Sequence, residues 1–317
     1  YDNVFVRLRG NSSNFGPKKN FKFDFNRGYD FLIAEGENRI TEINIANTYW
    51  DKAYLRTSLA YETFRQAGVP APLANPIRMD RNGDFFMVAH LVEQIDEDFL
   101  IRRGLDPEGA MYKFERNPVW NATDALSKRT RQHEGNSDLQ AVVNGIHPSN
   151  SRRTQYLFDN INLPQVINYL AAGVIIQDVD RIIHNNFMYR DTNGNGEWYV
   201  FPWDKDLTFG TSHIFDDADV IWADDENNGG NPLRSGSHPL HGDSEHRWYG
   251  ATDLEWNRMI DAIHDTPATQ QMLMRRLRTL MDEFLQPPDT PANELKFEQR
   301  LDELETLMNA DVLLDRA

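Results

Sequence analysis

Two short aromatic-rich segments, flanked by acidic and amide residues, constrain this chain more than any other feature. Asn186 to Arg190 (NFMYR) and Glu197 to Phe201 (EWYVF) are separated by six turn-forming residues, which is the pattern of a β-hairpin. Asp180 and Asn185 precede the hairpin, and Asp204 follows it in the sequence PWDKD. Because a hairpin returns the chain to its starting point, we expect these side chains to lie close together. Oxygen ligands grouped in this way suit a divalent cation and a phosphate.

A helix is predicted directly before this hairpin, over residues 162–177. Asn162 is a suitable N-cap and Pro164 suits the first turn. Apolar residues then recur at helical spacing: Val166, Ile167, Leu170, Ala171, Val174 and Ile175. The sequence therefore predicts a buried helix that delivers Asp180 into a loop.

Composition narrows the class of protein and of partner. A chain of 317 residues can bury a large core, in one large domain or two closely associated ones. The net charge of −16 argues against a nucleic-acid partner and favours a basic protein or a metal-bound anion. The absence of cysteine excludes disulfides and thiolate zinc sites, and no apolar run reaches membrane-spanning length. The chain starts at Tyr1 directly in a strand pattern, so we expect it to be a trimmed portion of a longer protein.

The first third of the chain is predicted to be mostly antiparallel sheet. Alternating or turn-bounded patterns predict strands over residues 4–9, 20–25, 40–45, 75–79, 85–93 and 111–114. One long helix is predicted from an Asp51 cap to Gln66, and Asp96 is a cap for a short helix ending at Arg103. These elements predict an N-terminal sheet lobe over residues 1–115.

The rest of the chain is predicted to be mainly helical. Residues 117–136 are polar and irregular, and residues 212–250 form a long stretch rich in Gly, Asp, Asn and His. Further helices are predicted over residues 138–146, 151–158, 253–264, 267–285 and 293–314. The fold class is therefore α+β, with a larger helical lobe over residues 116–317.

The loop between the first two strands has the composition of an anion-binding loop. It offers the hydroxyls of Ser12 and Ser13 and the cations Arg9, Lys19 and Lys22. Lys22 is our first choice for a phosphate contact because it lies inside the strand, and Lys19 is nearly as good. A solvated basic hairpin tip explains the spacing about as well.

The order of these parts is the one used for phosphoryl transfer. The protein-kinase plan places a catalytic Asp, an Asn five residues later on the metal, and a second metal-binding Asp after the next strands. Asp180, Asn185 and Asp204 fit this spacing. Asp206 is a second candidate ligand, since residues two apart on an extended segment share a face. The alternative is a capped turn with surface acids.

Two other patterns in the second half have simpler explanations. Asp191, Asn193 and Asn195 imitate the start of a calcium loop, but Pro202 occupies the position that requires a bidentate Glu. A hairpin turn is the better interpretation. The histidines of the long stretch, His238, His241 and His246, lack the helical motif or cysteine ligands of a transition-metal site.

The chain resembles the CotH kinases, a bacterial family named for spore coat protein H. The resemblance is carried by LRGNSS with KKNFKF, by WDKAYLRTSLAYETFRQAG, by the strand ending in Glu93, by MYKF, and above all by DRIIHNNFMYRD with FPWDKDLTFG. These motifs run in the family's order from Val4 to Gly210. The resemblance implies an atypical protein-kinase-like fold, a secreted, cell-surface or spore-coat location, and the use of ATP with Mg²⁺ or Mn²⁺.

Matching positions imply roles for individual residues. Asp180 would be the catalytic base, Asn185 and Asp204 the metal ligands, and Glu62 an ion-pair partner of the phosphate-binding lysine. Glu93 would belong to the cofactor-binding set. The substrate would be Ser or Thr of a protein. We expect this protein to be Ser-rich, and to be basic because the chain is acidic.

The sequence also departs from ordinary protein kinases. The glycine-rich loop G-x-G-x-x-G is missing, and neither HRD nor DFG is present as such. A nucleotide-binding pseudokinase or a structural surface protein without turnover is therefore an open alternative. A hydrolase that uses Asp180 and Asp204 as a carboxylate pair is a third.

Overall fold

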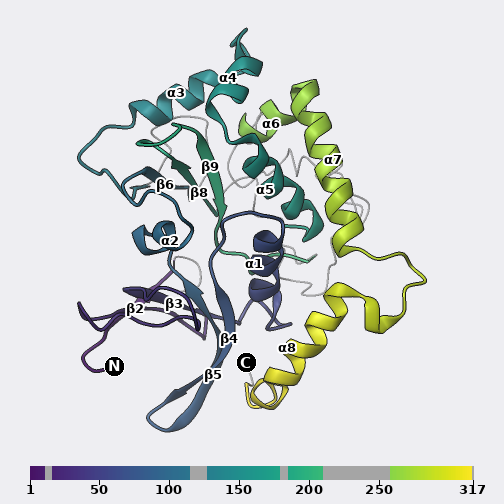
Figure 1. Ribbon diagram of the computed structural model, residues 1–317. Helices are drawn as coiled ribbons and strands as arrows, with labels where there is room; N and C mark the ends of the chain where they lie inside the picture. Colours follow the sequence, from purple (N-terminus) through teal and green to yellow (C-terminus); the bar gives the residue numbers. More distant parts are fainter. Residues whose placement is uncertain (11–15, 115–126, 179–184, 210–257, 316–317) are drawn as a thin grey trace. The chain divides into compact units, whose positions relative to one another are not determined.

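The computed structural model describes residues 1–10, 16–114, 127–178, 185–209 and 258–315 (Figure 1). The fold belongs to the predicted α+β class. Two compact units divide the chain: unit 1 comprises residues 1–62, 71–107 and 284–317, and unit 2 comprises residues 63–70 and 108–283. This division differs from the predicted boundary at residue 115, because the last helix groups with the N-terminal sheet.

Unit 1 is built on a five-stranded antiparallel sheet in the order β1-β2-β3-β5-β4. Its strands are β1 (Phe5–Arg9), β2 (Asn20–Asp24), β3 (Glu42–Asn47), β4 (Ala74–Arg81) and β5 (Asp84–Glu93). Alternation along β3 and β5 places Ile43, Ile45, Met87 and Ala89 in one buried apolar cluster. The predicted strands therefore form, with shifted ends.

Two short helices form in the first third of the chain, and one of them begins later than predicted. Asp96 caps α2 (Glu97–Arg102) as predicted, accepting the N–H of Phe99 at 3.1 Å. Helix α1 (Arg56–Gln66) begins five residues after Asp51. The Asp51 carboxylate accepts the N–H of Arg56 at 2.9 Å across a turn in which Tyr54 has a φ of 62°. This left-handed residue prevents the helix from starting at Asp51.

A buried Ser-His-Asp array connects α1 to the sheet of unit 1. The Oγ of Ser58 lies 2.9 Å from Nδ1 of His90 on β5, and Nε2 of His90 lies 3.7 Å from Asp51. All three residues are at most 1% exposed. Because no substrate can reach Ser58 in this arrangement, the array is a packing contact and not a hydrolase site.

The C-terminal helix α8 (Lys296–Val312) packs along β4 and β5 within unit 1 (Figure 1). The short 3-10 helix η5 (Ala292–Glu294) precedes it, so the predicted helix over residues 293–314 is shorter than expected. Arg300 of α8 donates two hydrogen bonds to Glu62, at 2.7 and 2.8 Å. Asp311 pairs with Arg78 at 2.9 Å.

Asp315, just beyond α8, is a buried anchor in unit 1. Its carboxylate pairs with Lys18 and accepts the N–H of Val88 at 2.8 Å. Its backbone carbonyl accepts the hydroxyl of Tyr54 at 3.1 Å. The end of the chain is therefore held by three different segments of the unit.

Unit 2 contains an antiparallel sheet of four strands in the order β7-β6-β8-β9. These are β6 (Ala110–Phe114), β7 (Ser127–Lys128), β8 (Asn186–Arg190) and β9 (Trp198–Pro202). The helices of this part are α3 (Ser137–Gly145), α4 (Arg153–Asn160), α5 (Leu163–Ile175), α6 (Arg258–Asp265) and α7 (Pro267–Phe284). Strand β7 lies in the stretch predicted to be irregular. It is only two residues long, and these residues pair with Tyr112 and Lys113 of β6.

Helix α5 covers the free edge of β9 (Figure 1). Asn162 caps the helix as predicted, accepting the N–H of Gln165 at 3.1 Å. The Gln165 side chain then donates to the carbonyl of Val200 at 2.6 Å and accepts its N–H at 2.9 Å. The buried Gln165 amide therefore makes the two hydrogen bonds that a further strand would make, and satisfies the backbone of Val200 at the edge of the sheet.

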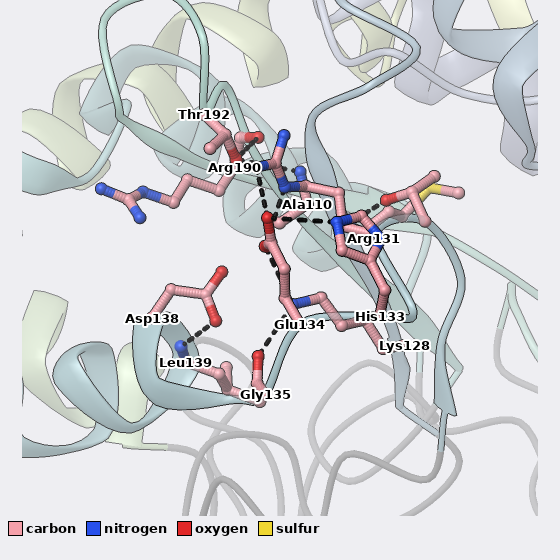
Figure 2. A network of polar contacts seen from close by, with 12 residues as sticks. Ala110, Lys128, Arg131, His133, Glu134, Gly135, Asp138, Leu139, Arg190 and Thr192 are labelled. Carbon is pink, nitrogen blue, oxygen red and sulfur yellow. Dashed lines mark hydrogen bonds and ion pairs between the residues drawn. The ribbon is translucent and has the colours of Figure 1, made fainter.

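A polar network fixes the turn between β7 and α3 (Figure 2). Arg131 donates to Glu134 through Nε at 2.8 Å, and Lys128 lies 3.6 Å from the same carboxylate. The hydrogen bonds from Arg131 hold the pKa of Glu134 below its usual value. Nearby, the hydroxyl of Tyr112 on β6 donates to Asp138 at 2.5 Å. Burial is the main cause that raises the pKa of Tyr112, and this hydrogen bond raises it further. The network orders the turn against β6.

No helix in the described ranges is long and apolar enough to cross a membrane.

Candidate functional site

The end of α5 is a tightly closed helix terminus. Gln177 has a left-handed φ of 49° and its N–H donates to Val174 O at 3.0 Å. The N–H of Asp178 donates to Gly173 O at 2.9 Å. This pair of bonds is the Schellman pattern, with Gln177 in the position that usually holds glycine. The Asp178 side chain is fully buried as a result of this turn.

The β8–β9 hairpin is held at its closed end by Asp191. The carboxylate accepts the N–H of Asn195 at 3.1 Å, and the carbonyl accepts that of Gly196 at 2.9 Å. A Cβ at Gly194 would lie 2.1 Å from the Asp191 carboxylate, so a larger residue here would displace this side chain. The predicted interpretation of this stretch as a turn is confirmed.

The open end of the same hairpin carries the predicted metal ligands. Asn186 pairs with Pro202, and the next residue, Trp203, donates its N–H to Asn185 O at 3.0 Å. Asn185 and Asp204 both have left-handed φ values, 62° and 52°. Non-glycine residues in this region are concentrated among Asn and Asp and often mark functional positions. The backbone therefore brings Asn185 and Asp204 to the same end of one hairpin, as predicted.

The segment after β9 alternates between exposed and buried side chains. Asp204 is exposed, Lys205 is buried and Asp206 is half-buried. The Nζ of Lys205 lies 2.9 Å from Asp178 Oδ2, and both side chains are 0% exposed. The N–H of Phe209 donates to Ile176 O at 2.6 Å. The segment is thus tied back to the end of α5.

The residues at this end of the hairpin fit a hard divalent cation. Mg²⁺ takes oxygen ligands and few of them from protein, with water and phosphate completing the shell. Asn185 supplies an amide oxygen and Asp204 an exposed carboxylate, with Asp206 two residues further on. Over the described ranges no three His, Asp or Glu residues form a metal-binding cluster, so a transition-metal site of protein ligands alone is not found there. A cation held here would depend on phosphate or water ligands.

Three of the predicted residues lie outside the described residues: Asp180, Ser12 and Ser13. The three histidines of the long stretch, His238, His241 and His246, also lie outside them.

The predicted phosphate-binding cations lie on or beside the first hairpin of unit 1. Arg9 ends β1 opposite Asn20, and Lys22 lies in the middle of β2, opposite Arg7. Lys22 forms an ion pair with Glu42 of the neighbouring strand. Lys19 donates to the carbonyl of Gly16 at 2.8 Å.

The expected partner of the lysine is different in the structure. Glu62 pairs with Arg300 of α8 and not with Lys22, which pairs with Glu42 instead. Glu62 was expected to pair with the phosphate-binding lysine, Lys22 or Lys19, and in the structure it pairs with Arg300. The reason is that α8, remote in sequence, supplies a guanidinium whose two N–H groups match the Glu62 carboxylate.

Glu93 is engaged inside unit 1. Its carboxylate is 1% exposed, pairs with Arg102 of α2, and accepts the N–H of Leu73 at 2.9 Å. This side chain joins β5, α2 and the start of β4.

Sequence reasoning missed the buried pair Asp178–Lys205. The sequence signal for Lys205 was its position between two large apolar residues, Trp203 and Leu207, both of which are buried. The signal for Asp178 was an acid close to the end of the mostly apolar helix α5. Only the fold reveals that the two charges meet.

Three comparisons relate this chain to known proteins. A family model described as CotH kinase protein matches residues 6–311. Inner spore coat protein H of Bacillus subtilis (strain 168) is 24% identical over 222 residues, which are 65% of this chain and 59% of that protein. The chain thus spans less than two thirds of this relative's length.

A solved structure is also similar at a low level. The crystal structure of the Helicobacter pylori proinflammatory kinase CtkA matches with a TM-score of 0.35 and 12% identity, over 91% of this chain and 94% of that chain.

Proposed function

Since the chain belongs to the CotH kinase protein family, we propose that it transfers the γ-phosphoryl group of ATP to a Ser or Thr hydroxyl of a protein. The observation that carries this proposal is the open end of the β8–β9 hairpin. There the Trp203–Asn185 backbone bond of 3.0 Å brings Asn185 next to a segment that presents Asp204 to solvent.

In the proposed reaction each acidic or amide residue has one role. Asp180 orients the substrate hydroxyl and accepts its proton while the hydroxyl oxygen bonds to the γ-phosphorus and ADP leaves. Asn185 and Asp204 hold the cation, with Asp206 as the alternative ligand. Bound Mg²⁺, or Mn²⁺ in its place, neutralises charge that develops on the phosphate oxygens.

We further propose that Arg9, Lys19, Lys22 and the Ser12–Ser13 hydroxyls bind the phosphates of ATP. Lys22 pairs with Glu42, so phosphate would compete with this carboxylate. Glu62 and Glu93 would contribute indirectly. Their ion pairs with Arg300 and Arg102 support the packing of unit 1, which carries the phosphate-binding residues.

The test is phosphate incorporation from γ-labelled ATP into a basic, Ser-containing peptide. We expect Asp180→Asn to lower kcat by about 10²–10⁴-fold, the usual range for loss of a general base. Asp204→Asn should raise the Mg²⁺ concentration needed for half-maximal rate. Asp289→Asn, an exposed carboxylate in a loop of unit 1, is the matched control and should transfer at the wild-type rate. Equal rates for wild type and Asp180→Asn would contradict the assignment.

A second function is supported by the name of the relative, an inner spore coat protein. In this case the chain would be a coat or cell-surface protein that binds nucleotide without turnover. ATP with Mg²⁺ would then raise the unfolding temperature by mass action while no phosphorylated product forms. Measuring both quantities on the same sample separates the two functions.

A further inference from the structure

We propose that Asp178 and Lys205 are positioning residues, whose buried ion pair sets the direction of the Asp204 carboxylate. This inference rests on the proposed function, in which Asp204 holds the cation. Neither residue belongs to the protein-kinase spacing of Asp180, Asn185 and Asp204.

The contact joins two places that the function requires to be fixed. The Nζ of Lys205 lies 2.9 Å from Asp178 Oδ2. Asp178 ends the turn after α5, two residues before Asp180 in the chain, and Lys205 directly follows Asp204. The pair therefore connects the start of the catalytic loop to the segment that holds the metal ligands.

The burial of this pair is informative. Both side chains are 0% exposed. Removing two charges from water carries a large desolvation cost, and a buried pair is commonly no more stable than apolar residues of similar volume. Stability alone therefore does not account for charges at this place. What an ion pair adds is a fixed distance between the two groups that carry it, which apolar contacts specify less strictly.

The backbone around Lys205 converts this fixed point into a fixed direction. The N–H of Trp203 is held by Asn185 O, and the N–H of Phe209 is held by Ile176 O at 2.6 Å. The hydroxyl of Thr208 donates to Lys205 O at 3.2 Å. With both ends and the middle of the segment tied, Lys205 points inward and Asp204 outward. A shift of Lys205 would therefore also move Asp204, the preceding residue in the chain.

The deciding variant is the double substitution Asp178→Leu with Lys205→Met, which replaces both charges with apolar groups. Single substitutions would leave one buried charge unpaired and could unfold the protein. For the double variant we expect an unfolding temperature close to that of wild type. We expect kcat to fall about tenfold or more, because small misplacements of reacting groups are costly. The half-saturating Mg²⁺ concentration should rise, while KM for the peptide stays near its wild-type value.

Two measurements do not depend on turnover. Amide hydrogen exchange at Trp203 and Phe209 should become faster in the double variant, since both N–H groups belong to the tied segment. Binding of Mn²⁺ in the presence of ATP, followed by the spectroscopic signal of free Mn²⁺, should become weaker. Val142→Ala, in the buried face of α3 in the same unit, is the control for loss of stability alone. It should leave Mn²⁺ binding unchanged and should speed exchange only at amides that open by global unfolding, without the local effect at Trp203 and Phe209.

The outcomes separate this inference from the proposed function. If wild type transfers no phosphate, the proposed function fails, and faster exchange together with weaker Mn²⁺ binding in the double variant still supports the positioning role. If the double variant keeps the wild-type kcat, Mg²⁺ dependence and exchange rates, the positioning role is overturned even though the kinase activity stands.

Discussion

At the scale of single residues, Asp96 has an unusual protonation equilibrium. Burial raises its pKa to about 8, although the hydrogen bond from the N–H of Phe99 acts in the opposite direction. The neighbouring charges of Asp98, Glu42 and Glu97 add to the increase. A carboxyl with a usual pKa of about 3.9 therefore stays protonated in the fold near neutral pH.

The sign of the resulting pH dependence follows from proton linkage. Between about pH 4 and pH 8 the folded chain holds a proton on Asp96 that the unfolded chain has lost. The free energy of unfolding contributed by this group is therefore highest below pH 4 and falls as the pH rises toward 8. Asp96→Asn keeps an oxygen for the cap and cannot ionise. We expect the variant to be more stable than wild type at pH 9, by on the order of 5 kcal/mol, and close to it at pH 4.5. Urea unfolding at both pH values checks this, and an equal difference at both would contradict it.

At the scale of elements, α8 is held in unit 1 by its polar contacts. Asp315 is the most buried of these, because its carboxylate serves both Lys18 and the N–H of Val88. Asp315→Ala would leave a buried ammonium and a strand N–H without this acceptor. We expect a loss of about 2–4 kcal/mol in the free energy of unfolding. Amide exchange at Val88 should become faster in the same variant.

The control for this substitution is Glu305→Ala on the same helix. Glu305 is exposed, so its removal should change the free energy of unfolding by less than about 0.5 kcal/mol. A comparable loss in both variants would mean that the removal of any carboxylate from this part of the chain, and not the loss of the anchor, explains the effect.

The elements themselves were largely predictable, because their signals are local. Alternation in β2 and β5, the Asn162 cap and the hairpin turn at Asp191 each depend on neighbours within a few residues. The start of α1 was not predictable, since a left-handed Tyr54 carries no composition signal. The grouping of α8 with unit 1 was also missed, because its partners Glu62 and Arg78 are more than 200 residues away in the chain.

The candidate site shows the same division between local and distant information. Asn185 and Asp204 were placed together by the hairpin, whose register follows from the sequence. Lys205 and Asp178 were missed because charged residues are usually exposed, and only tertiary packing buries them together. The Lys22–Glu42 pair was not predicted for a related reason. A resemblance in the order of parts does not state which carboxylate a given lysine will meet.

At the scale of the whole molecule, the charge balance makes a prediction about substrates. The chain has 49 acidic and 33 basic side chains, a net charge of −16. Such an excess attracts cationic partners and repels anionic ones over distances that salt screens, about 10 Å at 0.1 M and 3 Å at 1 M. If the proposed kinase activity is present, a Lys- and Arg-rich peptide should have a KM that rises as NaCl is increased from 50 to 500 mM, while kcat changes little.

The control is a peptide of the same length with the same phosphorylatable Ser and with Gln in place of each Lys and Arg. Its KM should be independent of salt. A neutral peptide that is used as efficiently as the basic one at low salt would contradict charge steering. Substrate choice would then depend on contacts near the reacting hydroxyl and not on the field of the protein.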